Sequence, residues 1–253
     1  MLFPDQSAER APAGNLATGW LKLIAVFFMF IDHSGKMLFA NMQEMRMLGR
    51  IAFPIYVWCM IVGLHYTRSV PKYLLRVLTV GILSQPLYMW GLNHTWNQPN
   101  IFLTLALGLC ALWGIREKRY GSGIWAPAAA ILLANVLGAD YGWKGIMLFI
   151  LLYAVRDSRS GIAAVTVAWF LFWGTYYKLF DTILGIRIPY DQMTQAVKLV
   201  VQPFLHLETM ALLSLPFLLI RFRKDIRLPK WVSYGLYPAH LLLLIALEKI
   251  VGV

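Results

Sequence analysis

The chain has 253 residues, of which 59% are hydrophobic and only 14% are charged, and its mean hydropathy is +0.62. These values exclude an ordinary soluble domain and are typical of helical proteins that cross a membrane several times. A net charge of +11 favours nucleic-acid binding in a soluble protein, but in a membrane protein it indicates basic cytoplasmic loops. We therefore expect no nucleic-acid partner.

The N-terminal segment and the two cysteines exclude further classes. Residues 1–18 include Asp5 and Glu9 and have no apolar core, so we predict a cytoplasmic tail and not a cleavable signal peptide. Residues 19–253 then form a single transmembrane domain. Cys59 and Cys110 indicate neither a disulfide framework nor a metal site, and we expect no metal cofactor.

Nine apolar stretches follow in chain order, and each is a candidate membrane-spanning helix. They comprise residues 19–38, 51–67, 73–92, 101–115, 124–137, 143–155, 162–180, 208–222 and 231–248. Residues 193–207 are amphipathic and have two interpretations: an interfacial helix, or the start of a long span that bends at Pro203. We predict an all-α polytopic transmembrane helix bundle of about nine spans.

The loop charges predict which side of the membrane each loop faces. With the N-terminus inside, the inner segments contain most of the 23 Lys and Arg residues, notably in 68–76, 116–119, 156–159 and 221–230. The outer loop 93–100 has none, and the outer loop that contains Asp140 has only Lys144. Basic residues concentrate in short cytoplasmic loops, so we predict a cytoplasmic N-terminus.

Two titratable residues share one face of the first predicted helix. His33 follows Lys22 by eleven positions, which brings the two side chains within roughly 20° of each other and about 16 Å apart along the axis. A titratable group at membrane depth is costly and usually faces a protein interior or an aqueous cavity. We predict a passage from the cytoplasmic surface near Lys22 to His33, whose imidazole is suited to act as a general base.

Three further charged residues lie at a similar depth. Asp32 is about 100° further round the helix than His33, so we expect it to orient a neighbouring helix instead of pairing with His33. Arg50 opens the second span and either extends to the outer surface or takes part in the site. Glu208 requires a cationic partner at that depth, and Arg50 and Lys36 are the candidates.

The remaining histidines are weaker candidates. His240 lies in mid-span two residues after Pro238, and it either satisfies the backbone that this proline disrupts or lines a cavity. His65, His94 and His206 lie near predicted interfaces, where a solvated histidine is the simpler interpretation.

Several short segments carry a family resemblance when they are taken together in order. They are Lys22 with Ile31-Asp32-His33, Gly49-Arg50-Ile51-Ala52-Phe53-Pro54, Asn100-Ile101-Phe102, Asp140-Tyr141-Gly142-Trp143-Lys144-Gly145-Ile146 and Tyr237-Pro238-Ala239-His240-Leu241. On these segments the chain resembles, over almost its full length, the TraX family, membrane acetyltransferases of the kind that acetylate the N-terminus of conjugative pilin. It is more distantly similar to transmembrane acyltransferases of the acyltransferase-3 and heparan-glucosaminide acetyltransferase families.

The resemblance implies acetyl transfer in the bacterial inner membrane from cytoplasmic acetyl-CoA to an acceptor on the outer side. The implied catalytic residues are His33, Asp32 and Arg50, with Arg50 or backbone donors at a proline-bent helix stabilising the oxyanion. The implied cofactor-binding residues, which contact the phosphates, are Lys22, Arg68, Lys72 and Arg76. The implied substrate-binding residues are Asn100, Tyr141, Glu208 and His240. Direct attack and an acyl-histidine intermediate both remain open.

The expected acceptor is the N-terminal amine of a pilin-like protein, in a role connected with conjugation. O-acetylation of an envelope glycan uses the same chemistry and remains an alternative. A proton-coupled transporter, with His33 and Glu208 relaying protons, is an alternative of a different class. Such transporters often contain two related halves, and no internal repeat is apparent in the sequence. Membrane lipids are expected partners in every case.

Overall fold

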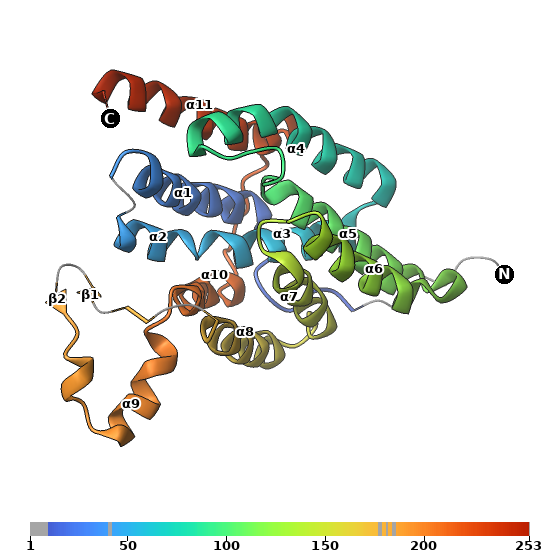
Figure 1. The fold of residues 1–253 in the computed structure, drawn as a ribbon. Helices are drawn as coiled ribbons and strands as arrows, with labels where there is room; N and C mark the ends of the chain where they lie inside the picture. Colours follow the sequence, from blue (N-terminus) through green and yellow to red (C-terminus); the bar gives the residue numbers. More distant parts are fainter. Residues whose placement is uncertain (1–9, 40–41, 177–178, 181, 184–185, 253) are drawn as a thin grey trace.

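The computed structural model describes residues 10–39, 42–176, 179–180, 182–183 and 186–252. Its regular structure is a bundle of helices with one small β-hairpin (Figure 1). The α-helices are α1 Thr18–Met37, α2 Gln43–Gly49, α3 Ala52–Tyr66, α4 Val70–Leu92, α5 Ile101–Glu117, α6 Ser122–Val136, α7 Gly142–Ala154, α8 Arg159–Gly174, α9 Gln195–Val201, α10 Leu215–Leu219 and α11 Lys230–Val251. The hairpin pairs β1 Thr182–Ile183 with β2 Ile186–Arg187 in antiparallel register. The expectation of a helical protein is confirmed.

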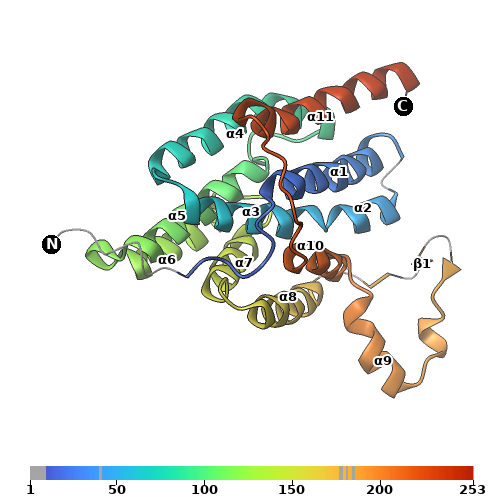
Figure 2. The ribbon, with the colours of Figure 1, turned by 180° about the vertical axis from the view of Figure 1, so that it is seen from behind.

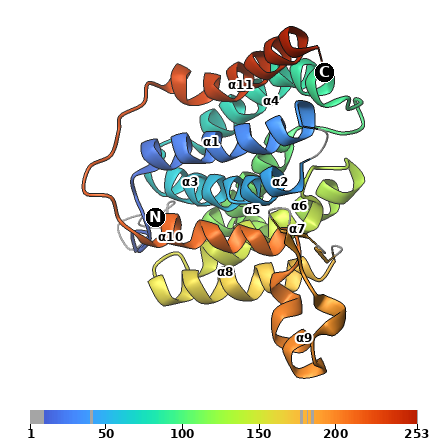
Figure 3. The ribbon, with the colours of Figure 1, turned by 90° about the vertical axis from the view of Figure 1, so that its left-hand side faces the viewer.

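Helix α3 occupies the centre of the bundle. Its sequence is apolar all round, which is the pattern of a helix that is buried on every side. Trp58, Ile55 and Ile61 are fully buried, and α3 contacts α1, α5 and α7 (Figure 3). The outer layer follows from this arrangement: α1 packs against α2 and α11, and α4 packs against α5 and α11. The charged ends of these helices therefore meet at the two ends of the bundle.

The observed helices agree with most of the predicted spans within a few residues. Helix α2 was missed, because residues 43–49 are more polar than a span; α2 and α3 together form one continuous apolar helix, Gln43–Tyr66. Among the described residues, Gln43–Tyr66 and Lys230–Val251 are long and apolar enough to cross a membrane, while Gly142–Ala154 and Glu208–Leu219 are shorter apolar helices. The count of nine spans stays a prediction.

The predicted seventh and eighth spans differ from the observed helices. The seventh, 162–180, ends as helix α8 at Gly174, and the chain then leaves the bundle. The eighth begins as a 3-10 helix, Glu208–Ser214, and continues as α10. Glu208 and Thr209 are buried in this first turn, so the tighter helix holds polar side chains against the bundle.

Residues 193–207 do not begin a long span. Helix α9 ends in a 3-10 turn, Gln202–Phe204, and an isolated β-bridge between Leu179 and His206 then separates it from the helix at Glu208. Together with the hairpin, α9 projects from the bundle (Figures 1 and 3). Its apolar side chains, including Leu199 and Val200, are exposed.

Part of the predicted N-terminal tail packs inside the bundle. Asn15 is fully buried, its carbonyl oxygen accepts a hydrogen bond from Trp58 Nε1 at 2.7 Å, and its side-chain amide donates to the Phe217 carbonyl at 3.0 Å. Residues 1–9 lie outside the described residues. Residues 13–17 are therefore a structural part of the bundle and not a free tail.

The connection from α10 to α11 crosses the back of the bundle (Figure 2). On this connection, Asp225 accepts hydrogen bonds from the backbone N–H groups of Gly19 at 3.0 Å and Trp20 at 3.3 Å. A carboxylate satisfies the unpaired N–H groups at the start of a helix and complements the helix dipole. Asp225 thus fixes the connection against the first turn of α1.

Candidate functional site

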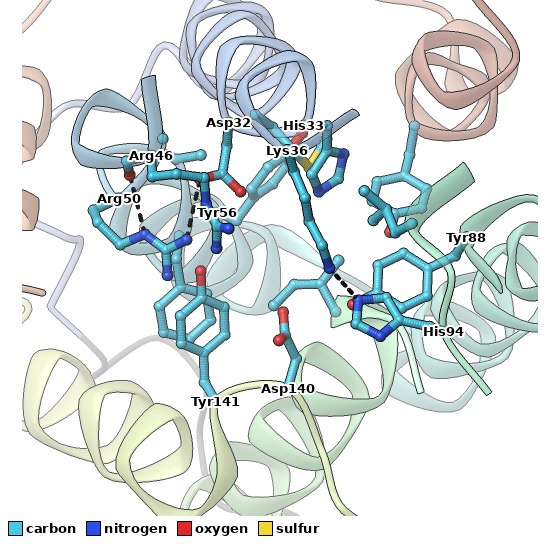
Figure 4. A pocket seen from close by; sticks show the side chains of 17 residues that line it. Asp32, His33, Lys36, Arg46, Arg50, Tyr56, Tyr88, His94, Asp140 and Tyr141 are labelled. Atoms are coloured by element: carbon cyan, nitrogen blue, oxygen red, sulfur yellow. Dashed lines mark hydrogen bonds and ion pairs between the residues drawn. The ribbon is translucent and has the colours of Figure 1, made fainter. Parts of the chain in front are cut away.

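A polar cavity of about 210 Å³ lies at the end of the bundle where α1 ends and α3 begins (Figure 4). We call it the histidine cavity. Its walls come from α1, the α2–α3 junction, the end of α4, the α6–α7 connection and α11. The charged and titratable residues that line it are Asp32, His33, Lys36, Arg46, Arg50, Tyr56, Tyr88, His94, Asp140, Tyr141 and Tyr237.

His33 lines this cavity and is hydrogen-bonded to a second histidine. Its Nδ1 lies 2.9 Å from Nε2 of His240, and the two rings are stacked with centroids 5.1 Å apart. One of these nitrogens donates and the other accepts. Nε2 of His33 makes no hydrogen bond within the described part of the chain. His240 is buried and lies behind His33 outside the cavity wall, so it positions His33 instead of lining the site.

A network of ion pairs joins α1, α2, the α2–α3 junction and the helix at Glu208. Arg50 donates to Asp32 Oδ1 at 3.1 Å and to Glu208 Oε1 at 3.0 Å. Arg46 donates to the same Asp32 oxygen at 3.0 Å. The Arg50 side chain is only 11% exposed and that of Glu208 only 3%, so neither reaches bulk water.

This network answers three questions that the sequence left open. Asp32 pairs across to α2 and α3 and not with His33, which confirms the expectation from its angle on the helix. Arg50 takes part in the site and does not extend to the surface. Arg50, and not Lys36, is the partner of Glu208. Glu208 lies behind Arg50 and does not line the cavity, so the position does not support its predicted contact with substrate.

Gly49 is required by the close approach of α1 to α2. A Cβ atom at this position would overlap the Cβ and carboxylate of Asp32. Any side chain here would push Asp32 away from Arg46 and Arg50. The Gly-Arg pair in the sequence therefore has one structural purpose, which is to seat the carboxylate between the two guanidinium groups.

The outer mouth of the cavity holds residues that the sequence did not single out as a group. Lys36 Nζ lies 2.7 Å from Nε2 of His94, and the His94 ring stacks on Tyr88. His94 therefore contacts the site instead of being only solvated. Burial lowers the pKa of His94, which favours the neutral ring that accepts from Lys36. Asp140 enters from the opposite side (Figure 4).

Two of the predicted substrate-binding residues lie in very different places. Tyr141 lines the cavity and stacks on Phe53 with centroids 3.9 Å apart. Asn100 lies outside it: its side chain accepts from the Phe102 N–H at 3.0 Å and donates to the Gly81 carbonyl at 2.7 Å. The polar groups of Asn100 thus begin α5 and attach it to α4, and its position does not support the predicted role in substrate binding.

A second cavity, of about 490 Å³, lies at the other end of the bundle. We call it the basic pocket, because all five of its charged lining residues are cations: Lys22, Arg68, Lys72, Arg76 and Lys230. The structure therefore brings together all four predicted cofactor-binding residues. None of the five makes an ion pair with a carboxylate in the described ranges, which leaves their charge uncompensated.

Three helices begin at the basic pocket. Thr18 in the first turn of α1, Ser69 at the start of α4 and Lys230 at the start of α11 all line it. Helix N-termini carry partial positive charge and unpaired N–H groups, and they bind anions such as phosphate. Asp225 already caps the first N–H groups of α1, so the helix N-termini that add to the positive potential here are those of α4 and α11.

A narrow cavity of about 60 Å³ lies between the two sites, and we call it the passage. It shares Lys22, Cys59, Tyr73, Ser233 and Tyr234 with the basic pocket and shares Tyr56, Ile101 and Tyr237 with the histidine cavity. Most of the remaining lining is apolar, from Met60, Val77, Phe102 and Leu105. The three cavities therefore follow one another along the bundle, from Lys22 to His33.

The fold and its cavities define an apolar helical bundle with two polar sites of different charge and a narrow cavity between them that shares lining residues with both. The chain belongs to the TraX family: the family model described as TraX protein matches residues 17–248. This confirms the family that the sequence segments indicated.

Three curated relatives have similar levels of identity. A probable fimbrial assembly protein, FimC of serogroup H1, from Dichelobacter nodosus is 28% identical over 88% of this chain and 92% of its own length. Protein TraX of Escherichia coli K12 is 28% identical over 57% of this chain and 60% of its own length. An uncharacterized protein of Rickettsia prowazekii is 29% identical over 56% of this chain. No solved structure matches the chain.

Proposed function

We propose that the protein is an integral acetyltransferase of the bacterial inner membrane. In this proposal, acetyl-CoA binds from the cytoplasm in the basic pocket, and the acceptor enters the histidine cavity from the outer side. The observation that carries the proposal is the series of three cavities with shared lining residues. A long acyl carrier requires such a passage, because its charged nucleotide and its thioester lie at opposite ends of a flexible arm.

The basic pocket has the chemistry that the nucleotide phosphates of CoA require. Lys72 and Arg76 lie on the first turns of α4, whose N-terminus faces the same space. Phosphate oxygens bind well to Lys, Arg and helix N-termini together. The basic pocket therefore fits the nucleotide of CoA, and the apolar passage fits the arm that follows it.

One buried polar atom supports the same path. The Tyr237 side chain lines both the passage and the histidine cavity, and its hydroxyl has no hydrogen-bond partner among the residues that the structure describes. A buried hydroxyl without a partner is costly, so a ligand that supplies one is favoured. Bound acetyl-CoA supplies an acetyl thioester near this point.

His33 is the base in this proposal. In the required tautomer, Nδ1–H of His33 donates to Nε2 of His240, which leaves Nε2 of His33 free to accept a proton from the attacking group of the acceptor. As the new bond to the acetyl carbon forms, the bond from that carbon to sulfur breaks, and the departing thiolate takes up the proton that His33 received from the acceptor. Arg50, held by Asp32 and Glu208, is the fixed cation beside the cavity that can stabilise the oxyanion.

The relatives favour a protein acceptor over an envelope glycan. The relative that aligns over most of both chains is described as a probable fimbrial assembly protein, and another is Protein TraX. We therefore propose the N-terminal amine of a pilin-like protein as the acceptor, in fimbrial assembly or conjugation. Release of free CoA that depends on an acceptor peptide distinguishes this enzyme from a proton-coupled transporter.

The two cysteines allow a direct test of the passage. Cys59 lines both the basic pocket and the passage, whereas Cys110 lines neither. In purified Cys110→Ala protein, acetyl-CoA at ten times its Kd should slow the reaction of Cys59 with a small thiol reagent about tenfold. The matched control is Cys59→Ala, in which labelling of Cys110 should not respond to acetyl-CoA. Labelling of Cys59 that is unchanged by saturating acetyl-CoA would falsify the proposed path.

A further inference from the structure

Two charged groups in the histidine cavity have no ion-pair partner in the described part of the chain. Asp32 and Glu208 are neutralised by Arg46 and Arg50. The Asp140 carboxylate makes neither a hydrogen bond nor an ion pair, and Lys36 is bonded only to the ring of His94. The cavity therefore presents one free anion and one cation that is not neutralised.

These two groups face each other across the outer mouth. Asp140 lies on the α6–α7 connection and Lys36 lies near the end of α1, and both side chains point into the cavity (Figure 4). Asp140 lines the cavity, and the residue as a whole is solvent-exposed. The surrounding protein nevertheless raises the pKa of its carboxyl by burial, and the charge of Arg50 opposes this shift. A cation bound beside Asp140 would supply the ion-pair partner that this carboxylate lacks.

An anion and a cation that line the same cavity favour a ligand that carries both a cationic group and a hydrogen-bond acceptor. The first residue of a polypeptide carries a protonated amine, and three bonds from that nitrogen it carries a carbonyl oxygen. An ammonium group requires a carboxylate, and a carbonyl oxygen requires a donor. The hydroxyl group of a glycan is uncharged, so an unpaired carboxylate would form no ion pair with it and would favour an ammonium group instead.

We propose that Asp140 binds the protonated α-amino group of the acceptor polypeptide and that Lys36 donates to the carbonyl oxygen of the same first residue. This inference rests on the proposed function and assigns its acceptor specificity to two named side chains. The transfer forms a carbon–nitrogen bond and breaks the carbon–sulfur bond of the thioester. The bound ammonium first loses one proton to water, the neutral amine then attacks, and its second proton passes through His33 to the departing CoA thiolate.

The test compares acceptor peptides that differ only in the first group. One peptide has a free N-terminal amine and the other has a hydroxyl in its place. Asp140→Asn should raise the KM for the amine peptide about 10- to 100-fold, the usual effect of losing a hydrogen bond to a charged group. The KM for acetyl-CoA and the rate with the hydroxyl peptide should not change. Glu44→Gln is the matched control, since Glu44 lies on α2 at the same end of the bundle but does not line the cavity.

A second measurement uses the wild-type protein and does not depend on a variant that folds. The amine peptide should protect Asp140 from labelling by a carbodiimide, and the same peptide with an acetylated N-terminus should not. Lack of protection, or an unchanged KM in Asp140→Asn, overturns this inference while wild-type transfer continues. Absence of acetyl transfer by the wild-type protein to either peptide overturns the proposed function itself.

Discussion

The two polar sites of this bundle differ in whether their charged side chains have partners within the chain. In the histidine cavity, Arg50 and Arg46 are fixed by Asp32 and Glu208, and His33 is fixed by His240. In the basic pocket, five cations lie together with no carboxylate among the described lining residues. One site has most of its partners within the chain, and the other has five cations that form no ion pair among the described residues.

This difference separates two kinds of task. Groups that act on a reacting centre must keep their geometry when the substrate changes, and internal ion pairs hold them in place. Groups that capture a ligand gain most when the ligand brings the missing charge, because like charges in one pocket repel each other until it binds. The predictions below test whether substitutions at the two ends separate in this way.

The largest effect is expected from His33→Ala. Removing a general base should lower kcat for acetyl transfer about 10²- to 10⁴-fold, with the KM for acetyl-CoA little changed. His240→Gln retains a hydrogen-bond partner for His33 and should have a much smaller effect. Kinetics of acetyl transfer on purified protein provide the measurement. If His33→Ala transfers acetyl groups at the wild-type rate, His33 is not the general base and the proposed mechanism is wrong.

The next effect is on stability. Arg50→Gln leaves the Asp32 and Glu208 carboxylates without their shared cation, and breaking a buried ion pair from one side costs about 3–5 kcal/mol. The free energy of unfolding should fall by an amount in this range. The double substitution Arg50→Gln with Glu208→Gln should recover part of the loss. If the double substitution lowers the free energy of unfolding by the sum of the losses from Arg50→Gln alone and Glu208→Gln alone, the ion pair does not couple the two segments.

The basic pocket should respond in binding and not in turnover. Lys72→Ala combined with Arg76→Ala should raise the KM for acetyl-CoA about tenfold or more and leave kcat near the wild-type value, because these charges act on a remote part of the ligand. High salt should weaken binding to the wild-type protein in the same direction. Arg119→Ala is the control, since Arg119 is a cation at the same end outside the pocket. If Lys72→Ala, Arg76→Ala and Arg119→Ala raise the KM for acetyl-CoA equally, the effect comes from the general surface charge and not from the basic pocket.

The smallest effect is a dependence of stability on pH at the outer mouth. Burial lowers the pKa of His94 below its ordinary value of 6.5, and the charge of Lys36 contributes in the same direction. Its stabilising contribution is therefore complete above pH 6.5 and is lost as the pH falls through the lowered pKa. The difference in Tm between the wild type and His94→Gln should accordingly shrink from pH 7.5 to pH 5. A difference that is constant over this range contradicts the assigned protonation state.

The sequence was sufficient for what depends on a single helix. Apolar runs placed most helices within a few residues, and the eleven-residue interval placed Lys22 and His33 at connected cavities on one face of α1. The angular offset of Asp32 from His33 correctly predicted that it contacts another helix. Each of these results follows from helix geometry alone.

The sequence was insufficient where two distant segments meet. The contacts of His33 with His240 and of Lys36 with His94 depend on how α1 packs against α11 and the end of α4, and no interval in the sequence encodes this packing. The N-cap role of Asn100 could not be told from a ligand-binding role in the sequence, because the same amide side chain serves both. A signal for Asp140 was present, since it is a lone carboxylate beside Tyr141 in a predicted loop whose other charged residue is Lys144, but it could not be linked to the site until the fold supplied the cavity.

The last helix completes both ends of the molecule at once. Helix α11 supplies Lys230 to the basic pocket, Tyr237 to the passage and His240 to the pair with His33, although it packs chiefly against α1 and α4 at one side of the bundle. A chain without α11 would therefore lack a wall of the basic pocket and of the passage, and it would lack the histidine that holds His33. On the proposed function, truncation before Lys230 should abolish both ligand binding and transfer.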